Sequence, residues 1–167
     1  MAGRLLDAGS GTGRNREFYP PAAIVSGIDT SPAMLAKAHD RCPAGQLFEM
    51  DVTALEFPTG SFDAAVATFL FCVLPDQLQV PALRELGRIV KPGGVIRLLE
   101  YVRPHRTVHR LISYLWQPWI KWAYGASFDR DTERHIPSAG LELLESCHVV
   151  NDLLKILTVR VPHREAI

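Results

Sequence analysis

The sequence predicts a doubly wound α/β fold, in which a mostly parallel sheet carries helices on both faces. Apolar segments of strand length alternate with segments of helix length, which is the pattern of parallel sheets. The segment Phe62–Phe71 is apolar without alternation, as expected of a central strand that is covered on both sides. A glycine-rich turn, Gly9–Gly13, follows the first expected strand and precedes a helix, so we expect a ligand at this strand end.

Strands and helices are expected to alternate up to residue 101, with short breakers rich in proline and glycine between them, such as Lys91–Gly94. Pro81 lies early in the third of these helices, which predicts either a kink or a helix that begins near Val80. The expected strands are Arg4–Asp7, Ala23–Ile28, Gln46–Glu49, Phe62–Phe71 and Val95–Tyr101, and the expected helices are Arg14–Phe18, Pro32–Arg41 and Gln77–Val90.

The pattern changes after residue 101. Arg106–Tyr124 has a helical pattern rich in aromatic residues, and Asp129–Ala139 predicts a short helix that Gly140 ends. Leu141–Val150 and Leu153–Val161 are then expected to form an antiparallel hairpin that completes the sheet. A chain of 167 residues without an internal repeat predicts a single domain, residues 1–167.

Composition narrows the classes of function. The chain has 18 basic and 18 acidic residues, so it lacks the basic excess of a nucleic-acid-binding surface. No segment is long and apolar enough to span a bilayer, and no cationic, apolar signal segment precedes the glycine turn. The three cysteines are odd in number and far apart, which predicts reduced cytoplasmic thiols and no metal site.

The spacing of the glycine turn limits the kind of ligand. Gly9-Ser10-Gly11-Thr12-Gly13 reads G-x-G-x-G, which is neither the dinucleotide fingerprint G-x-G-x-x-G nor a phosphate loop. No lysine lies near the turn to meet phosphates. The turn therefore favours a nucleotide-like cofactor without phosphate over ATP or NAD.

Two acidic residues follow the next two expected strands. Asp29 closes the second strand, where a carboxylate can accept hydrogen bonds from both hydroxyls of a ribose. The alternative is that Asp29 only caps the helix that begins near Pro32, with Thr30 or Ser31 sharing that role. Asp51 follows the third strand, where it can accept from the exocyclic amine of adenine; the alternative is a solvated loop acid.

Together these residues resemble the class I S-adenosylmethionine-dependent methyltransferases, of the methyltransferase type 11 domain kind. The matching pieces occur in that family's order and at similar spacing over roughly residues 4–101. They are Leu6–Gly13, Gly27–Leu35, Asp51-Val52, Phe57–Asp63 and Leu83–Gly94. The resemblance implies a seven-stranded Rossmann-like sheet with an antiparallel last strand, S-adenosylmethionine as cofactor, and methyl transfer as the activity.

The resemblance also implies roles for single residues. Asp7 and Gly9–Gly13 would hold the methionine part of the cofactor, and Asp29 its ribose. Asp51 would hold the adenine, and Thr68–Leu70 would line the side of the methyl group. The full expected cofactor-binding set is Asp7, Ala8, Gly9, Ser10, Gly11, Thr12, Gly13, Asp29, Thr30, Met34, Asp51, Val52, Thr68, Phe69 and Leu70.

Shorter resemblances within the family concern the methyl acceptor. Leu99–Pro104 is similar to a strand end of the quinone-biosynthesis C-methyltransferases, and Asn15–Pro21 with Thr68–Leu74 to methyltransferases of alkyl thiols. Bacterial phosphatidylethanolamine N-methyltransferases share much of the pattern. The implied acceptor is therefore small or lipophilic: a lipid amine, a quinol or a thiol. Family members usually carry an N-terminal helical lid, and only Met1–Gly3 precede the first strand here, so we expect a domain without that lid.

A general base is optional in this chemistry, because the main task is to align an activated methyl group with its acceptor. A quinol or thiol must lose a proton, and Tyr19, Tyr101 and His105 are the candidate catalytic residues for that step. His105 and His109 are four residues apart and could share a helix face, but no third metal ligand is evident.

Trp116, Trp119 and Trp122 are spaced by three and form an aromatic stripe on the expected helix. The stripe is compatible with core packing, with the wall of an acceptor pocket, or with an anchor at a membrane surface. An active enzyme is also not the only function that the pattern allows. The alternatives are a cofactor-binding pseudoenzyme and a regulatory subunit of a partner methyltransferase.

Overall fold

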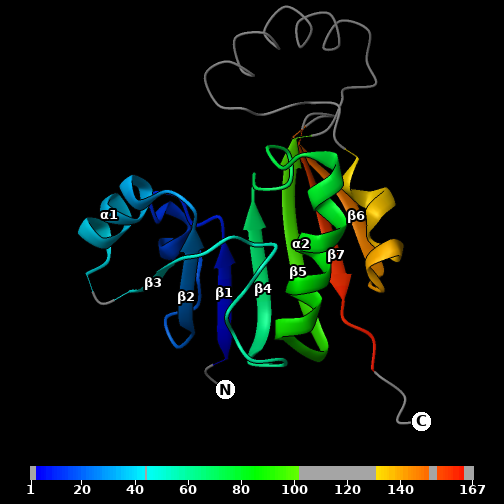
Figure 1. The fold of residues 1–167 in the computed structure, drawn as a ribbon, viewed down its shortest axis with the longest axis horizontal. Helices are drawn as coiled ribbons and strands as arrows, with labels where there is room; N and C mark the ends of the chain where they lie inside the picture. Colours follow the sequence, from blue (N-terminus) through cyan, green and yellow to red (C-terminus); the bar gives the residue numbers. More distant parts are fainter. Residues whose placement is uncertain (1–2, 44, 102–130, 151–153, 164–167) are drawn as a thin grey trace, which may run out of the picture.

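The computed structural model describes residues 3–43, 45–101, 131–150 and 154–163. Seven strands form one sheet in the order β3-β2-β1-β4-β5-β7-β6 (Figure 1). β1 to β5 pair in parallel, and β7 is antiparallel to both of its neighbours. The predicted parallel sheet with its closing hairpin is therefore confirmed. The strands are β1 Arg4–Ala8, β2 Ile24–Asp29, β3 Gln46–Glu49, β4 Phe62–Thr68, β5 Val90–Tyr101, β6 Glu142–Val150 and β7 Leu154–Arg160.

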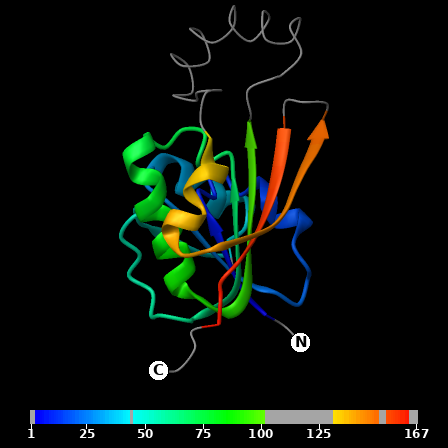
Figure 2. The same cartoon turned by 90° about the vertical axis from the view of Figure 1, so that its right-hand side faces the viewer.

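Two α-helices and three short 3-10 helices connect the strands in the described part of the chain. The α-helices are α1 Pro32–Arg41 and α2 Asp76–Ile89, and the 3-10 helices are η1 Arg14–Phe18, η2 Thr132–His135 and η3 Pro137–Ala139. α2 and the η2–η3 pair lie together on one side of the sheet (Figure 2). α1 has the predicted bounds. Arg14–Phe18 also has the predicted bounds but forms a 3-10 helix. The described part of Asp129–Ala139 forms the two 3-10 helices η2 and η3 instead of one helix, as is common for runs this short.

The expectation that α2 begins near Val80 is wrong. α2 begins at Asp76, and Pro81 lies inside it. Pro81 removes one backbone donor near the helix start, but Ala82, Leu83 and Leu86 are fully buried against the sheet. Tertiary packing of this face outweighs the loss of a single hydrogen bond.

Two strand bounds also differ from the prediction. β4 ends at Thr68 instead of Phe71, because Phe69 adopts a left-handed backbone with a φ of 57° that no strand can contain. β5 begins at Val90 and includes the expected breaker. The N–H of Gly93 donates to the carbonyl of Val161 at 2.8 Å, so a distant segment draws the breaker into the sheet.

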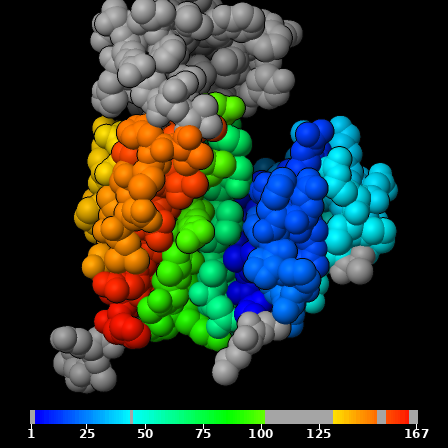
Figure 3. All heavy atoms as spheres, turned by 180° about the vertical axis from the view of Figure 1, so that it is seen from behind, coloured from blue at the N-terminus to red at the C-terminus, as the bar shows by residue number. Residues whose placement is uncertain are grey.

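The core lies between the sheet and α2. Phe62, Leu83, Leu86, Ile89, Ile96 and Leu98 have no exposed surface. The opposite face of the central strands carries a hollow of about 600 Å³, lined by residues of β1, β4, β5 and β7 and by the Phe18–Pro20 segment. Figure 3 views this face, with β4 and β5 in green beside the blue first segment. Within the described ranges, no helix is long and apolar enough to cross a bilayer.

Candidate cofactor site

The glycine turn leaves the carboxyl end of β1 with positive φ angles at all three of its glycines. Gly9 is closely packed, since a Cβ at this position would lie 3.1 Å from Cδ1 of Leu70. Gly11 is different, because a Cβ there would meet nothing nearer than the carbonyl oxygen of Gly9 at 4.0 Å. The backbone of Gly11 therefore borders open space, where a ligand can approach it closely.

Asp29 connects this turn to the start of α1. The N–H of Gly11 donates to Oδ2 of Asp29 at 2.9 Å, and the N–H of Ser31 donates to Oδ1 at 2.9 Å. Ser31 is the N-cap residue of α1, and among the described residues no side-chain hydrogen bond caps this helix. Asp29 thus does more than hold the start of α1, since it also fixes the glycine turn. Each carboxylate oxygen has a second acceptor position, which leaves capacity for two hydroxyl donors.

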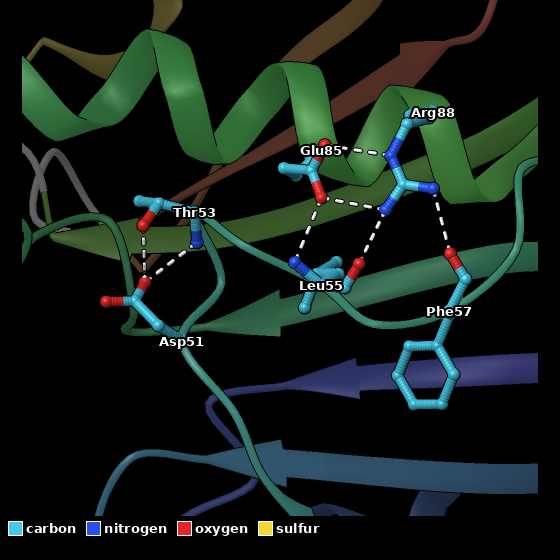
Figure 4. Close-up of polar contacts among 6 residues, drawn as sticks. All are labelled: Asp51, Thr53, Leu55, Phe57, Glu85 and Arg88. Carbon is cyan, nitrogen blue, oxygen red and sulfur yellow. Dashed lines mark hydrogen bonds and ion pairs between the residues drawn. The ribbon is translucent and has the colours of Figure 1, made fainter.

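Asp51 lies in the loop after β3 and is exposed. Its Oδ1 accepts hydrogen bonds from the N–H and the hydroxyl of Thr53 at 2.8 and 2.7 Å (Figure 4). In the described ranges its Oδ2 accepts no hydrogen bond. The next residue, Val52, is buried in the core, which anchors the loop at its base. Asp51 is therefore oriented by its own loop and retains a free acceptor oxygen.

A pair of charged residues on α2 holds the far end of the same loop. Glu85 and Arg88 form an ion pair at 2.8 Å. Glu85 accepts the N–H of Leu55 at 2.9 Å, and Arg88 donates to the carbonyls of Leu55 and Phe57 at 2.7 and 2.8 Å (Figure 4). The hydrogen bond from Arg88 lowers the pKa of Glu85, so this carboxylate stays charged. The sequence showed the motif that contains this pair but not the loop that it holds.

Asp7 and Tyr19 form a buried polar group behind the turn. Asp7 is 3% exposed and accepts a long hydrogen bond of 3.5 Å from the side chain of Asn15. Burial raises the pKa of Asp7 to about 6. Burial and the nearby charge of Asp7 also raise the pKa of Tyr19, and its buried hydroxyl has no hydrogen-bond partner at normal distance among the described residues. Both residues line a cavity of about 30 Å³ together with Ser10, whose buried hydroxyl also lacks a partner in the part of the chain that the structure describes.

The carboxyl ends of β4 and β5 meet beside the glycine turn. The ring of Phe69 stacks on that of Tyr101, with 4.6 Å between centroids and 21° between planes. Leu70 packs on Gly9 from the same turn. The expected residues Thr68–Leu70 and Tyr101 therefore do come together at one edge of the sheet.

Other expected site residues take no part in these contacts or lie elsewhere. Thr30 and Met34 are exposed at the start of α1. His105, His109, Trp116, Trp119 and Trp122 lie outside the described residues. Among the residues that the structure does describe, no group of three metal-ligating side chains is found.

The arrangement of a glycine turn, Asp29 and Asp51 at one sheet edge can be compared with known proteins. The profile described as "Methyltransferase domain" matches residues 5–94, which is just over half of the chain. The chain belongs to this methyltransferase family. S-Adenosylmethionine is the methyl donor of the family.

Curated members of the family with different acceptors resemble the chain. It is 35% identical over 105 residues to phosphatidylethanolamine N-methyltransferase of Cereibacter sphaeroides, covering 59% of this chain and 51% of that protein. It is 30% identical over 157 residues to the human thiol S-methyltransferase TMT1A, covering 87% and 62% respectively. It is 38% identical over 117 residues to demethylmenaquinone methyltransferase of Thermus thermophilus, covering 65% and 52%. The chain thus matches between 51% and 62% of the length of these relatives.

Solved structures show the same fold. A S-adenosylmethionine-dependent methyltransferase from Methanosarcina mazei superposes with a TM-score of 0.77 at 19% sequence identity. The superposition covers 96% of this chain and 93% of that one. The predicted Rossmann-like methyltransferase fold is therefore confirmed.

Proposed function

We propose that this chain binds S-adenosylmethionine at the glycine turn and transfers its methyl group to a small or lipophilic acceptor. The observation that carries the proposal is the hydrogen bond from Gly11 to Asp29. It places an open stretch of backbone next to a carboxylate that can still accept hydroxyl donors. This is the chemistry that a nucleoside without phosphates requires.

The polar groups of the site suit each part of this cofactor. Asp29 accepts the ribose hydroxyls, and the free oxygen of Asp51 accepts from the adenine amine. Asp7 and the glycine turn hold the methionine part, and Thr68–Leu70 border the methyl group. When bound, the cofactor supplies a sulfonium methyl that needs no further activation. The protein's task is to orient the acceptor toward it and to exclude water.

The two tyrosines of the site have different roles in this proposal. The raised pKa of Tyr19 keeps its hydroxyl protonated, which suits a hydrogen-bond donor and disfavours a general base. Tyr101 lies at the open edge, 36% exposed and stacked on Phe69. We assign Tyr101 to the acceptor side, where it orients the acceptor or takes its proton.

The acceptor class rests on the relatives and on the local surface. The acceptors in the names of the similar proteins are phosphatidylethanolamine, a thiol and demethylmenaquinone. The stacked rings of Phe69 and Tyr101 give an apolar surface to the sheet edge where β4 and β5 end. This surface favours a lipophilic acceptor over a charged one. A lipid amine, a thiol and a quinol therefore form the acceptor panel.

Calorimetric titration with S-adenosylmethionine, its demethylated product and NADH tests the proposal first. We expect micromolar affinity for the first two ligands and none for NADH. Radiolabelled methyl transfer is then measured to phosphatidylethanolamine vesicles, an alkyl thiol and a demethylated quinol. Absence of cofactor binding would reject the proposal, and binding without transfer to any acceptor would indicate a pseudoenzyme.

A further inference from the structure

Glu100 is a buried carboxylate that the proposed reaction does not use. It lies near the end of β5, is 3% exposed, and forms no ion pair within the described ranges. Its Oε1 accepts the N–H of Phe71 at 3.1 Å, and its Oε2 accepts the N–H of Cys72 at 2.6 Å. Burying a carboxylate without a charged partner is costly, so a carboxylate in such a place is a candidate functional residue.

The two N–H groups belong to the turn Phe69–Leu74, which connects β4 to α2. Phe69 holds a positive φ of 57°, a left-handed backbone that is strained for a residue with a side chain. Two further contacts hold the turn: Gln79 of α2 donates to the carbonyl of Phe71 at 2.9 Å, and the thiol of Cys72 donates to that of Phe69 at 3.2 Å. The turn is thus a strained segment that surrounding groups keep in place.

This turn is in direct contact with the candidate cofactor site. Leu70 packs on Gly9, where a Cβ would lie only 3.1 Å from Leu70 Cδ1 and 3.3 Å from its Cβ. Phe69 packs on Tyr101 on the acceptor side. A shift of the turn by about 1 Å would therefore move the glycine turn and the acceptor surface relative to each other, which alignment-dependent chemistry tolerates poorly.

We propose that Glu100 is a positioning residue for methyl transfer, because its carboxylate holds the turn Phe69–Leu74 against the glycine turn. This inference rests on the proposed function. It assigns to Glu100 no contact with cofactor or acceptor, and its effect passes through Leu70 and Phe69.

The charge state of Glu100 determines how many of its carboxyl oxygens can accept hydrogen bonds from the N–H groups of the turn. Burial raises the pKa of Glu100 to about 7, although both backbone donors oppose the rise. On the facing turn, the pKa of Cys72 is raised to about 12 by burial, so the thiol is neutral. Lys155 lies opposite on β7 and is paired with Glu133 of η2, while Gln79 of α2 is uncharged. Above pH 7 both oxygens accept, whereas below pH 7 one of them carries a proton.

The test compares Glu100→Gln with the wild-type chain, because glutamine keeps the size but removes the charge and one acceptor. Calorimetric titration with S-adenosylmethionine is repeated from pH 5.5 to pH 8.5. We expect Kd to rise about tenfold in E100Q at pH 8, the effect of losing a hydrogen bond to a charged group. At pH 5.5 we expect a rise within about twofold, because the wild-type carboxyl is then neutral as well.

Glu142→Gln is the matched control, since Glu142 is an exposed glutamate at the start of β6 that pairs with Arg160. The Kd of Glu142→Gln for S-adenosylmethionine, divided by the wild-type Kd, should stay near one at every pH. A purely structural role of Glu100 would change the unfolding curve without a pH-dependent Kd ratio. A flat ratio near one for E100Q, with normal binding by the wild type, would overturn the inference and leave the proposed function intact.

Amide hydrogen exchange without cofactor gives an independent measurement. In E100Q the amides of Phe71 and Cys72 should lose about tenfold in protection at pH 8, while amides in β2 stay unchanged. In the wild type the protection of these two amides should rise between pH 6 and pH 8, and this measurement needs no variant. Unchanged protection in both experiments would overturn the inference. A wild-type chain that binds no S-adenosylmethionine would instead reject the proposed function, and the inference with it.

Discussion

At the scale of single residues, the candidate site depends on a few backbone groups and the side chains that fix them. Asp29 accepts one N–H from the glycine turn and one from Ser31, the N-cap residue of α1. Its carboxylate therefore has a local structural role and spare acceptor capacity at the same position. Gly11 has the complementary property, because nothing lies within reach of its missing side chain except one carbonyl.

Asp29→Ala should weaken S-adenosylmethionine binding by about 2 kcal/mol, or about thirtyfold in Kd, because charged hydrogen-bond acceptors are lost. Calorimetric titration measures the change. Asp40→Ala is the control, since Asp40 is an exposed acid in the neighbouring helix α1. Equal affinity of D29A and wild type would refute the ribose role of Asp29.

Gly11→Ala separates the cost of backbone strain from the cost of a blocked ligand site. Gly11 has a φ of 54°, so alanine should destabilise the fold by about 1–2 kcal/mol. Gly60→Ala has the same kind of penalty, since Gly60 has a φ of 65° and lies in open space away from the site. We expect similar losses in urea unfolding for both variants, but a loss of cofactor affinity for G11A alone. Equal affinities would show that no ligand approaches Gly11.

At the scale of elements, α2 supports the candidate site from behind through two separate connections. Near its start, Gln79 holds the turn after β4. Near its end, Glu85 and Arg88 hold the loop that begins at Asp51. α2 therefore connects the acceptor side and the adenine side of the proposed site, although no residue of the helix was expected to belong to it.

Arg88→Ala should destabilise the chain by about 1–2 kcal/mol, because two backbone carbonyls and Glu85 lose their donor. It should also raise the Kd for S-adenosylmethionine, since the Asp51 loop is then free to move. Arg84→Ala, on the same helix, removes one exposed hydrogen bond to the carbonyl of Ser138 and should change either quantity little. Urea unfolding and calorimetry measure both quantities. Similar results for R88A and R84A would contradict the supporting role.

At the scale of the whole molecule, two buried acids govern how stability depends on pH. The pKa of Asp7 is raised to about 6 and that of Glu100 to about 7, in both cases by burial. A raised pKa means that the folded state holds a proton which the unfolded state has already released. Stability from these groups is therefore fully present below about pH 4 and is lost as the pH rises to 7.

We expect the free energy of unfolding to be higher at pH 5 than at pH 8, with Asp7 contributing about 1 kcal/mol and Glu100 about 2–3 kcal/mol to the difference, because the stability from Asp7 is already partly lost at pH 5. The ion-paired Asp63, Asp76 and Glu85 have lowered pKa values, so their contributions are lost only at more acidic pH. Urea unfolding at several pH values measures the profile. Asp7→Asn and Glu100→Gln should each flatten it, and a profile already flat in the wild type would contradict the burial of these charges.

The sequence by itself determined the sheet, its parallel direction and the position of the acids. Alternation of apolar strands with helices leaves few other arrangements, and residues after parallel strands must meet at one edge. The prediction therefore brought Asp29, Asp51 and the glycine turn to the same edge without any knowledge of their contacts. Their roles toward a ligand remain predictions.

Only the tertiary structure decided the features that depend on contacts between distant residues. β4 stops at Thr68 because the turn after it is held by Glu100, and β5 gains its first residues through pairing with Val161. Neither contact can be predicted from local secondary-structure propensity, since the partners are separated by about 30 residues or more in the chain. Burial of Glu100 follows from the same cause: a charged side chain becomes buried only where the fold supplies the donors that hold it.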